Sequence, residues 1–237
     1  MAAREVLLKR YAKSSFGAGV YRQLSDAEIA ERQRKAEEQR RLAQMLDARQ
    51  CRNLPPGYGK ANLDDLAALP LDAQEPYSRA LDRLNRIVAR DRDKPFIAAL
   101  IGVIGAGKTH MAAALINKFA SLGRTARYTT AMDYILAIRS TYGKDTEQSQ
   151  IENAHIHPEL LVIDEMQVRG ETAHEDLLLI RLIDKRYQHN RATLLISNHL
   201  TKQEFAERVD ARIMDRMNTA GGVCVVSWPS IRGRLKG

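Results

Sequence analysis

The eight residues from Gly102 to Thr109 constrain the fold more than any other part of this 237-residue chain. Their sequence, GVIGAGKT, fits the G-x-x-x-x-G-K-[ST] pattern of loops that bind phosphate groups. The loop follows the apolar run 96–101 and precedes a helical pattern over 111–122, which is the strand–loop–helix context that the pattern requires. Glycines allow successive backbone N–H groups to converge on phosphate oxygens. The sequence therefore predicts a nucleotide site, with a chance Gly-rich turn as the weaker alternative.

Several residues of this loop are candidates for binding a nucleotide and its metal ion. We expect Lys108 to reach the β- and γ-phosphates and the Thr109 hydroxyl to ligate Mg²⁺. The residues expected to hold the nucleotide are Gly102, Gly105, Ala106, Gly107, Lys108, Thr109 and His110. The expected cofactors are therefore ATP and Mg²⁺.

The composition is that of a globular α/β domain with a small appendage, since 44% of residues are hydrophobic and 28% are charged. No apolar run approaches the ~18 residues needed to cross a bilayer, and the N-terminus lacks a secretory pattern, so we expect a cytoplasmic protein with no membrane partner. The net charge of +8 favours a polyanionic partner. Cys51 and Cys224 lack the spacing of a disulfide framework or a zinc site.

The first 62 residues differ from the rest. Ser25 and Glu28 form a capping-box pattern that opens a helix to about Arg49. The helix is so polar that a solvated spacer and a docking element for a partner remain equally good interpretations. The segment 53–59 contains two prolines and two glycines, so we predict a linker and a domain boundary there. This gives a helical partner-binding region with its linker over 1–62 and a nucleotide-binding domain over 63–237.

Strands and helices alternate through the second region, which predicts a mainly parallel sheet sandwiched by helices. After a helix over 74–90, the expected strands are 96–101, 125–130, 159–164, 192–197 and 222–227, separated by helices over 108–122, within 131–154, over 173–188 and within 201–217. Ligands bind such sheets at the carboxyl ends of the strands. The alternating histidines His155 and His157 lack a third ligand type, so we interpret 155–157 as loop and strand edge, not as a metal site.

Two other strands end in polar residues at this same edge. Asp164 and Glu165 follow a buried apolar strand, so Asp164 is expected to hold Mg²⁺ and Glu165 to polarise the attacking water. Two surface acids that begin a loop are the alternative. Asn198 ends the strand 192–197 and is expected to contact the γ-phosphate or the water, whereas taken alone it would be a turn residue.

With these motifs the chain resembles the AAA+ ATPases, and within them the DnaC/DnaI helicase-loader and IstB group. Gly102–Thr109 is similar to Walker A, 160–165 to Walker B, Ser197-Asn198 to sensor 1, and 212–217 to the box that carries an arginine finger. The ending Trp228–Arg232 is similar to the W-x-S-Y-R ending of helicase loaders, with Ile in place of Tyr. The resemblance covers about residues 63–237 and leaves little room for the usual C-terminal helical lid.

The resemblance implies roles for further residues. Arg216 is the expected finger, with Arg212 as second choice, and an ordinary basic helix face is the alternative. The expected contacts to single-stranded DNA are Tyr142, Lys144, Thr172 and His174. Stacking on Tyr142 would contribute about 1–3 kcal/mol, although a tyrosine that caps a helix fits as well.

The function that these observations favour is an ATP-dependent loader of the replicative DNA helicase onto single-stranded DNA. In that function residues 1–50 bind the helicase, and the ATPase domain assembles with its neighbours into a ring or spiral. The alternative is an IstB-like ATPase that helps a transposase. A third hypothesis, an adaptor with a nucleotide-dependent assembly switch, would need a defective Glu165 or Arg216, yet both residue types are present.

Overall fold

The computed structural model describes residues 11–13, 21–23, 25–50, 52–66, 71–91, 93–168 and 173–231. The chain divides into two compact units, Met1–Leu46 and Asp47–Gly237. In the first unit, β1 (Tyr11–Lys13) pairs antiparallel with β2 (Tyr21–Gln23). Helix α2 (Asp26–Gln50) follows, and its last four residues belong to the second unit.

The start of α2 has the capping box that the sequence predicts. The Glu28 N–H donates to Ser25 Oγ at 3.3 Å, and the Ser25 N–H donates to Glu28 Oε2 at 3.0 Å. Farther along, Glu31 forms exposed ion pairs with Arg34 and Lys35. Such pairs, three and four residues apart, each add a few tenths of a kcal/mol to a solvated helix.

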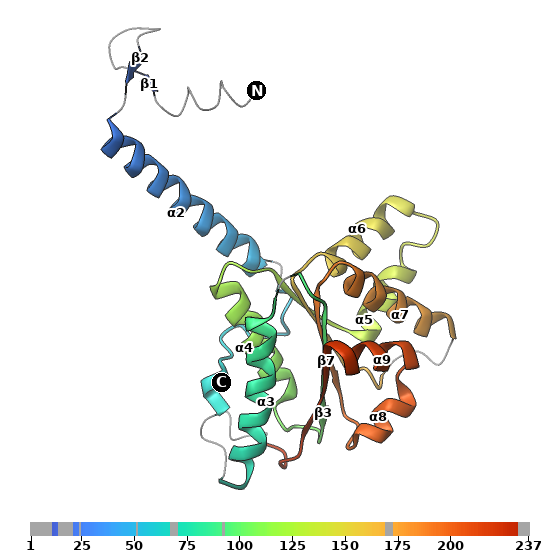
Figure 1. The fold of residues 1–237 in the computed structure, drawn as a ribbon. Coiled ribbons are helices and arrows are strands. Elements are labelled where there is room, and N and C mark those ends of the chain that lie inside the picture. The colour runs from blue at the N-terminus through green and yellow to red at the C-terminus, as the bar shows by residue number, and fades with distance from the viewer. Residues whose placement is uncertain are drawn as a thin grey trace. The chain divides into compact units, whose positions relative to one another are not determined.

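The second unit is built on a five-stranded parallel sheet with the order β4-β5-β6-β3-β7 (Figure 1). The strands are β3 (Phe96–Gly102), β4 (Ala126–Thr130), β5 (Leu160–Asp164), β6 (Ala192–Ser197) and β7 (Gly221–Val226). Every strand predicted from the sequence is present to within one residue at either end. The predicted fold class, a parallel α/β sheet sandwiched by helices, is confirmed.

Helices cover both faces of this sheet because successive side chains of a strand point to opposite sides. On β3, Ala98 and Leu100 pack with α3 (Leu71–Ala89) and α4 (Lys108–Ser121). Ile97, Ala99 and Ile101 pack on the other face with a second group of helices. That group is α5 (Ala131–Arg139), α6 (Asp145–Ile156), α7 (Ala173–Gln188), α8 (Lys202–Arg208) and α9 (Ala211–Ala220).

The interpretation of 155–157 as loop and strand edge is wrong for its first two residues, because His155 and Ile156 form the last turn of α6. Both side chains are buried in the second unit. His155 Nδ1 lies 2.8 Å from the Ile151 carbonyl oxygen, one helical turn earlier, and its ring packs edge-on against Tyr134. Burial lowers the pKa of His155 to about 4, so the ring is neutral at pH 7.

The fully buried Arg186 of α7 fastens the end of α6 to the sheet. Its guanidinium donates to the backbone carbonyls of His155, Ile156 and Pro158 at 2.7, 2.8 and 3.0 Å. It also donates to the Ala192 carbonyl and the Thr193 hydroxyl at the start of β6. A positive charge at the carbonyl end of a helix is favourable, which explains how backbone carbonyls can hold a buried arginine here.

The segment 53–59, which the sequence predicts as a linker, packs as part of the second unit, and that unit begins at Asp47. The Tyr128 N–H in β4 donates to the Arg52 carbonyl at 2.9 Å, and Asn53 Nδ2 donates to the Tyr128 carbonyl at 3.0 Å. Asn117 of α4 donates to the carbonyls of Tyr58 and Ala61 at 3.2 and 2.8 Å. Prolines and glycines prevent regular structure here, but they do not prevent close packing.

None of the helices in the described part of the chain combines the length and the apolar character that crossing a membrane requires.

Candidate functional site

The loop between β3 and α4 has a backbone that only glycine adopts without strain. Gly105 and Gly107 have φ angles of 81° and 86°, in the left-handed region. At Gly102 a side chain is excluded by space as well, since a Cβ atom there would lie 2.1 Å from the Val226 carbonyl oxygen of β7. The glycines of the motif thus shape a tight turn at the start of α4.

Lys108 lies in the first turn of α4 and is almost fully buried. Its ammonium group donates to the carbonyls of Gly102 and Val103 at 2.8 and 2.7 Å. Burial lowers the pKa of Lys108, while the neighbouring Asp164 carboxylate acts in the opposite direction. A buried ammonium held by two carbonyls gains much from a nearby anion, which is what a phosphate group would supply.

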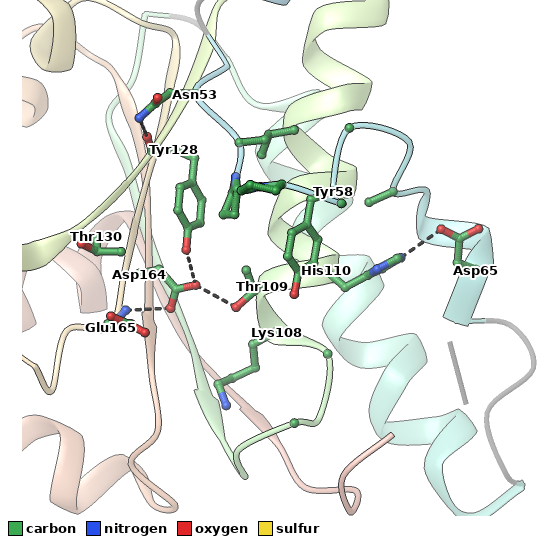
Figure 2. A pocket seen from close by; sticks show the side chains of 18 of the residues that line it. Asn53, Tyr58, Asp65, Lys108, Thr109, His110, Tyr128, Thr130, Asp164 and Glu165 are labelled. Atoms are coloured by element: carbon green, nitrogen blue, oxygen red, sulfur yellow. Dashed lines mark hydrogen bonds and ion pairs between the residues drawn. The ribbon is translucent and has the colours of Figure 1, made fainter. Parts of the chain in front are cut away.

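Asp164, at the carboxyl end of β5, accepts hydrogen bonds from three directions (Figure 2). Its Oδ2 atom accepts from the Thr109 hydroxyl at 2.8 Å and from the Tyr128 hydroxyl at 2.9 Å. Its Oδ1 atom accepts from the Glu165 N–H at 2.7 Å. The carboxylate is therefore fixed beside the phosphate loop, where the sequence places a metal ligand.

Glu165 has a φ angle of 56°, which is unusual for a residue other than glycine. Such a backbone costs of order 1 kcal/mol or more, and strain of this kind often occurs at functional sites. The side chain is exposed and lines the cleft described below. Strand β5 thus ends in one fixed carboxylate and one that is accessible to solvent.

Asn198 lies at the end of β6 and lines the same cleft. Gln167 connects it with the loop after β5, because Gln167 Oε1 accepts hydrogen bonds from the Asn198 N–H at 3.2 Å and from the Ser197 hydroxyl at 3.0 Å. The structure therefore brings Lys108, Thr109, Asp164, Glu165 and Asn198 to one edge of the sheet.

These residues open onto a cleft of about 1470 Å³. It is also lined by the segment Asn53–Ala61 and by Asp65 and His110 (Figure 2). The ring of Tyr58 lies edge-on to His110 at 6.2 Å, and His110 Nε2 lies 3.0 Å from Asp65 Oδ2. The cleft thus has a charged, loop-lined half and a half with aromatic and proline side chains.

The chemistry of both halves fits a nucleoside triphosphate and its metal ion. Backbone N–H groups, the N-terminus of α4 and Lys108 suit phosphate oxygens. The Thr109 hydroxyl and the Asp164 carboxylate are hard oxygen donors 2.8 Å apart, which are the ligands that Mg²⁺ takes beside a phosphate. The half around Tyr58 offers the apolar surface that a base requires.

The two candidate finger residues differ in their environments. Arg216 of α9 forms an ion pair with Asp184 and lies over the ring of Tyr187 at 5.0 Å, with 24% of its side chain exposed. Arg212 has 56% of its side chain exposed and pairs with Asp210 at 3.0 Å. Neither residue is among the described residues that line the cleft, and the role of both as a finger stays a prediction.

The residues expected to contact DNA lie in part together. Tyr142 follows α5, is half exposed, and has its hydroxyl 2.7 Å from Nε2 of His174 in α7. Lys144 is exposed and pairs with Glu147 at 3.3 Å. Thr172 lies outside the described residues. The role of this group stays a prediction.

A comparison with protein families finds that the model described as "IstB-like ATP binding protein" matches residues 12–235. The chain belongs to the IstB-like ATP-binding family. Over 138 residues this family member is 31% identical to the replicative helicase loader DnaC of Escherichia coli (strain K12). That alignment covers 57% of the present chain and 56% of the relative, so the chain matches about half the length of this curated protein.

Solved structures support the same fold. The crystal structure of the DnaC helicase loader superimposes with a TM-score of 0.60 at 20% identity, over 72% of this chain and 99% of that one. The replication initiator DnaA bound to AMPPCP and single-stranded DNA gives a TM-score of 0.59 at 18% identity, over 74% of this chain and 51% of that one. The IstB-like protein thus shares its fold with the DnaC helicase loader and with DnaA.

Three features of the site were not predicted from the sequence. Tyr128 has the sequence pattern of an ordinary strand residue. Its polar hydroxyl, two residues before the end of β4, is the feature that could have indicated a place near the site. The wall made by 53–61 was interpreted only as a linker. Gln167 follows the Asp-Glu pair by two positions, and nothing in a single sequence marks it as a link to Asn198.

Proposed function

We infer that this protein is an ATP-dependent loader of a replicative DNA helicase, and that it hydrolyses ATP during loading or release. The observation that carries this inference is the junction of the phosphate loop with Asp164, where the Thr109 hydroxyl donates a hydrogen bond to the carboxylate at 2.8 Å. The chain that contains this junction is 31% identical to a helicase loader over 138 residues. The junction supports nucleotide chemistry, and the relative supports the biological use of that chemistry.

In the proposed reaction, Lys108 and the loop N–H groups hold the β- and γ-phosphates, and Thr109 and Asp164 hold Mg²⁺. The ion neutralises charge on the phosphates. The Glu165 carboxylate accepts a hydrogen bond from a water molecule. It removes a proton from this water as the water oxygen attacks the γ-phosphorus. The bond from that phosphorus to the bridging oxygen of ADP then breaks.

Asn198 orients the γ-phosphate or the water, and Gln167 fixes the Asn198 backbone relative to the loop that follows Glu165. An arginine from a neighbouring subunit would stabilise the charge that develops on the phosphate oxygens. This makes hydrolysis conditional on assembly into a ring or spiral, which is the behaviour that a loader needs.

Single-stranded DNA is the second proposed partner, and the exposed pair of Tyr142 and His174 supports this proposal. Aromatic rings stack on bases of any sequence, and neighbouring lysines contribute a salt-dependent part of the affinity. Tyr142→Ala should weaken ATP-dependent binding of an oligonucleotide by about tenfold, which corresponds to the loss of one stacked base. Equal affinity of this variant and the parent would remove Tyr142 from the DNA site.

An IstB-like helper of a transposase is the second candidate function. The family match over residues 12–235 favours it, because that match extends farther along the chain than the alignment with the helicase loader. The chemistry of the nucleotide site would be the same in both functions. The partner protein therefore distinguishes them.

A pull-down with the full chain as bait separates the two candidates. We expect a replicative helicase as prey, and we expect that removing residues 1–46, the first compact unit, abolishes its capture while nucleotide binding persists. A transposase as prey would replace the loader with the second candidate. Full helicase capture by the shortened chain would place the partner site on the ATPase unit instead.

A further inference from the structure

The segment after β7 bonds directly to the phosphate loop. The indole N–H of Trp228 donates to the Ala106 carbonyl at 2.9 Å, and the Ile231 N–H donates to the Gly105 carbonyl at 2.9 Å. Trp228 and Ile231 are only 2% and 3% exposed. Two consecutive carbonyls of the loop thus receive their partners from a part of the chain more than one hundred residues away.

These bonds add to the internal hydrogen bonds of the loop, in which the Ala106 N–H and the Lys108 ammonium both donate to the Val103 carbonyl. A buried backbone carbonyl that lacks a hydrogen bond is costly, and the tight turn from Gly102 to Gly107 prevents the regular pairing of a helix or strand. The ring of Trp228 is itself held, since Tyr77 of α3 packs edge-on against it at 6.1 Å. The position of the loop is therefore determined in part by the segment 226–231.

The bonds also act on the N–H groups of the loop. The Gly105 carbonyl and the Ala106 N–H belong to one peptide group, and the Ala106 carbonyl and the Gly107 N–H belong to the next. A carbonyl that accepts a hydrogen bond polarises its peptide group and makes the N–H of that group a stronger donor. Donation by Ile231 and Trp228 should thus strengthen two N–H groups of the loop.

We propose that Trp228 and the segment that ends at Ile231 are positioning elements of the phosphate loop, so that nucleotide binding and the environment of Trp228 are coupled. The proposal rests on the proposed function only in that the cleft takes a nucleotide. Coupling of this kind is reciprocal: if the indole bond raises nucleotide affinity, a bound nucleotide must change the state of the indole.

The first test uses the unmodified chain, because Trp228 is its only tryptophan. The protein is titrated with ADP and with ATP while tryptophan emission is excited at the red edge, where adenine does not absorb. We expect an emission change that saturates at the same nucleotide concentration as binding measured by calorimetry, and no change in Lys108→Ala. If the unmodified chain binds nucleotide in the calorimeter while its tryptophan emission stays constant, the proposal is overturned. If the unmodified chain shows no calorimetric binding at all, the proposed function is contradicted instead.

The second test removes the indole donor and keeps an aromatic ring. Trp228→Phe should raise the calorimetric Kd for ADP about tenfold, the effect of losing one hydrogen bond to a buried carbonyl. Leu182→Ala is the control, since Leu182 is a buried α7 residue in the core on the other face of the sheet and should lower only the melting temperature. An unchanged Kd in folded Trp228→Phe would contradict the proposal, and if that variant does not fold, the emission titration decides.

Discussion

The buried hydroxyl of Tyr128 donates a hydrogen bond to Asp164 Oδ2 across 2.9 Å. Burial and the Asp164 charge both raise the pKa of Tyr128, so the hydroxyl keeps its proton at neutral pH and remains a donor. The backbone of Tyr128 is bonded on both sides to Arg52 and Asn53. The predicted linker thus contacts the strand residue that orients the carboxylate proposed to hold Mg²⁺.

Tyr128→Phe should therefore weaken the response to Mg²⁺ more than the binding of nucleotide. Loss of a hydrogen bond to a charged group should raise the Mg²⁺ concentration for half-maximal ATP hydrolysis about tenfold, with ATP affinity in the absence of Mg²⁺ nearly unchanged. Tyr134→Phe is the matched control, because Tyr134 is also buried but packs against His155 outside the cleft. Equal Mg²⁺ dependence of the Tyr128 variant and the parent would refute the role.

The arginine finger can be tested by mixing two inactive variants. A Glu165→Gln subunit still presents Arg216, and an Arg216→Ala subunit still has an intact Glu165 site. If Arg216 acts between subunits, its pair with Asp184 must open on assembly, and the mixture should recover part of an ATPase activity that falls about a thousandfold in either variant alone.

Arg212→Ala serves as the comparison for this experiment. We expect it to retain most of the parent activity, because its partner Asp210 is an N-cap residue of α9 and not a member of the site. Loss of activity in Arg212→Ala with retention in Arg216→Ala would assign the finger to Arg212. Failure to recover activity in a confirmed mixed assembly would exclude Arg216 from action in trans.

His155 should make the stability of the second unit depend on pH. Its pKa is about 4 in the folded chain, below the usual 6.5, so the unfolded chain takes up the proton first as the pH falls. The neutral ring therefore contributes about 3 kcal/mol to the free energy of unfolding above pH 6.5. This contribution is lost as the pH falls towards 4. Burial is the main cause, and Arg127 and Arg186 add to the shift.

Denaturant unfolding at several pH values between 4 and 7 measures this effect. His155→Leu should be less stable than the parent at pH 7, because the bond to the Ile151 carbonyl is lost, but its stability should fall less steeply towards pH 4. If the free energy of unfolding fell equally steeply with pH in both proteins, groups other than His155 would cause the acid sensitivity.

The order of the strands along the chain and the principal site residues could be predicted from the sequence because each has a local signal. A phosphate loop has fixed spacing, and Asp164 and Asn198 each end an apolar run at a position where parallel strands present their ligands. A buried strand also has a clear pattern, which is why β3, β5 and β6 were predicted to within a residue.

The contacts that were missed join segments that are distant in the sequence. Tyr128 reaches Asp164 across 36 positions and Trp228 reaches Ala106 across 122, and neither pairing leaves a trace in the spacing of one sequence. The Pro/Gly segment was predicted as a linker because its composition excludes regular structure. Composition does not show that Asn53 and Tyr58 form hydrogen bonds with β4 and α4.

The account as a whole depends on ATP being held by the phosphate loop and hydrolysed through Glu165. Calorimetric titration with MgATP, paired with phosphate release, tests this in the parent, Lys108→Ala and Glu165→Gln. Lys118→Ala, an exposed lysine in the last turn of the same helix, is the control and should match the parent. We predict that folded Lys108→Ala loses nucleotide binding, and that Glu165→Gln binds MgATP like the parent but releases almost no phosphate. Parental ATP affinity in Lys108→Ala, or parental turnover in Glu165→Gln, would contradict the account.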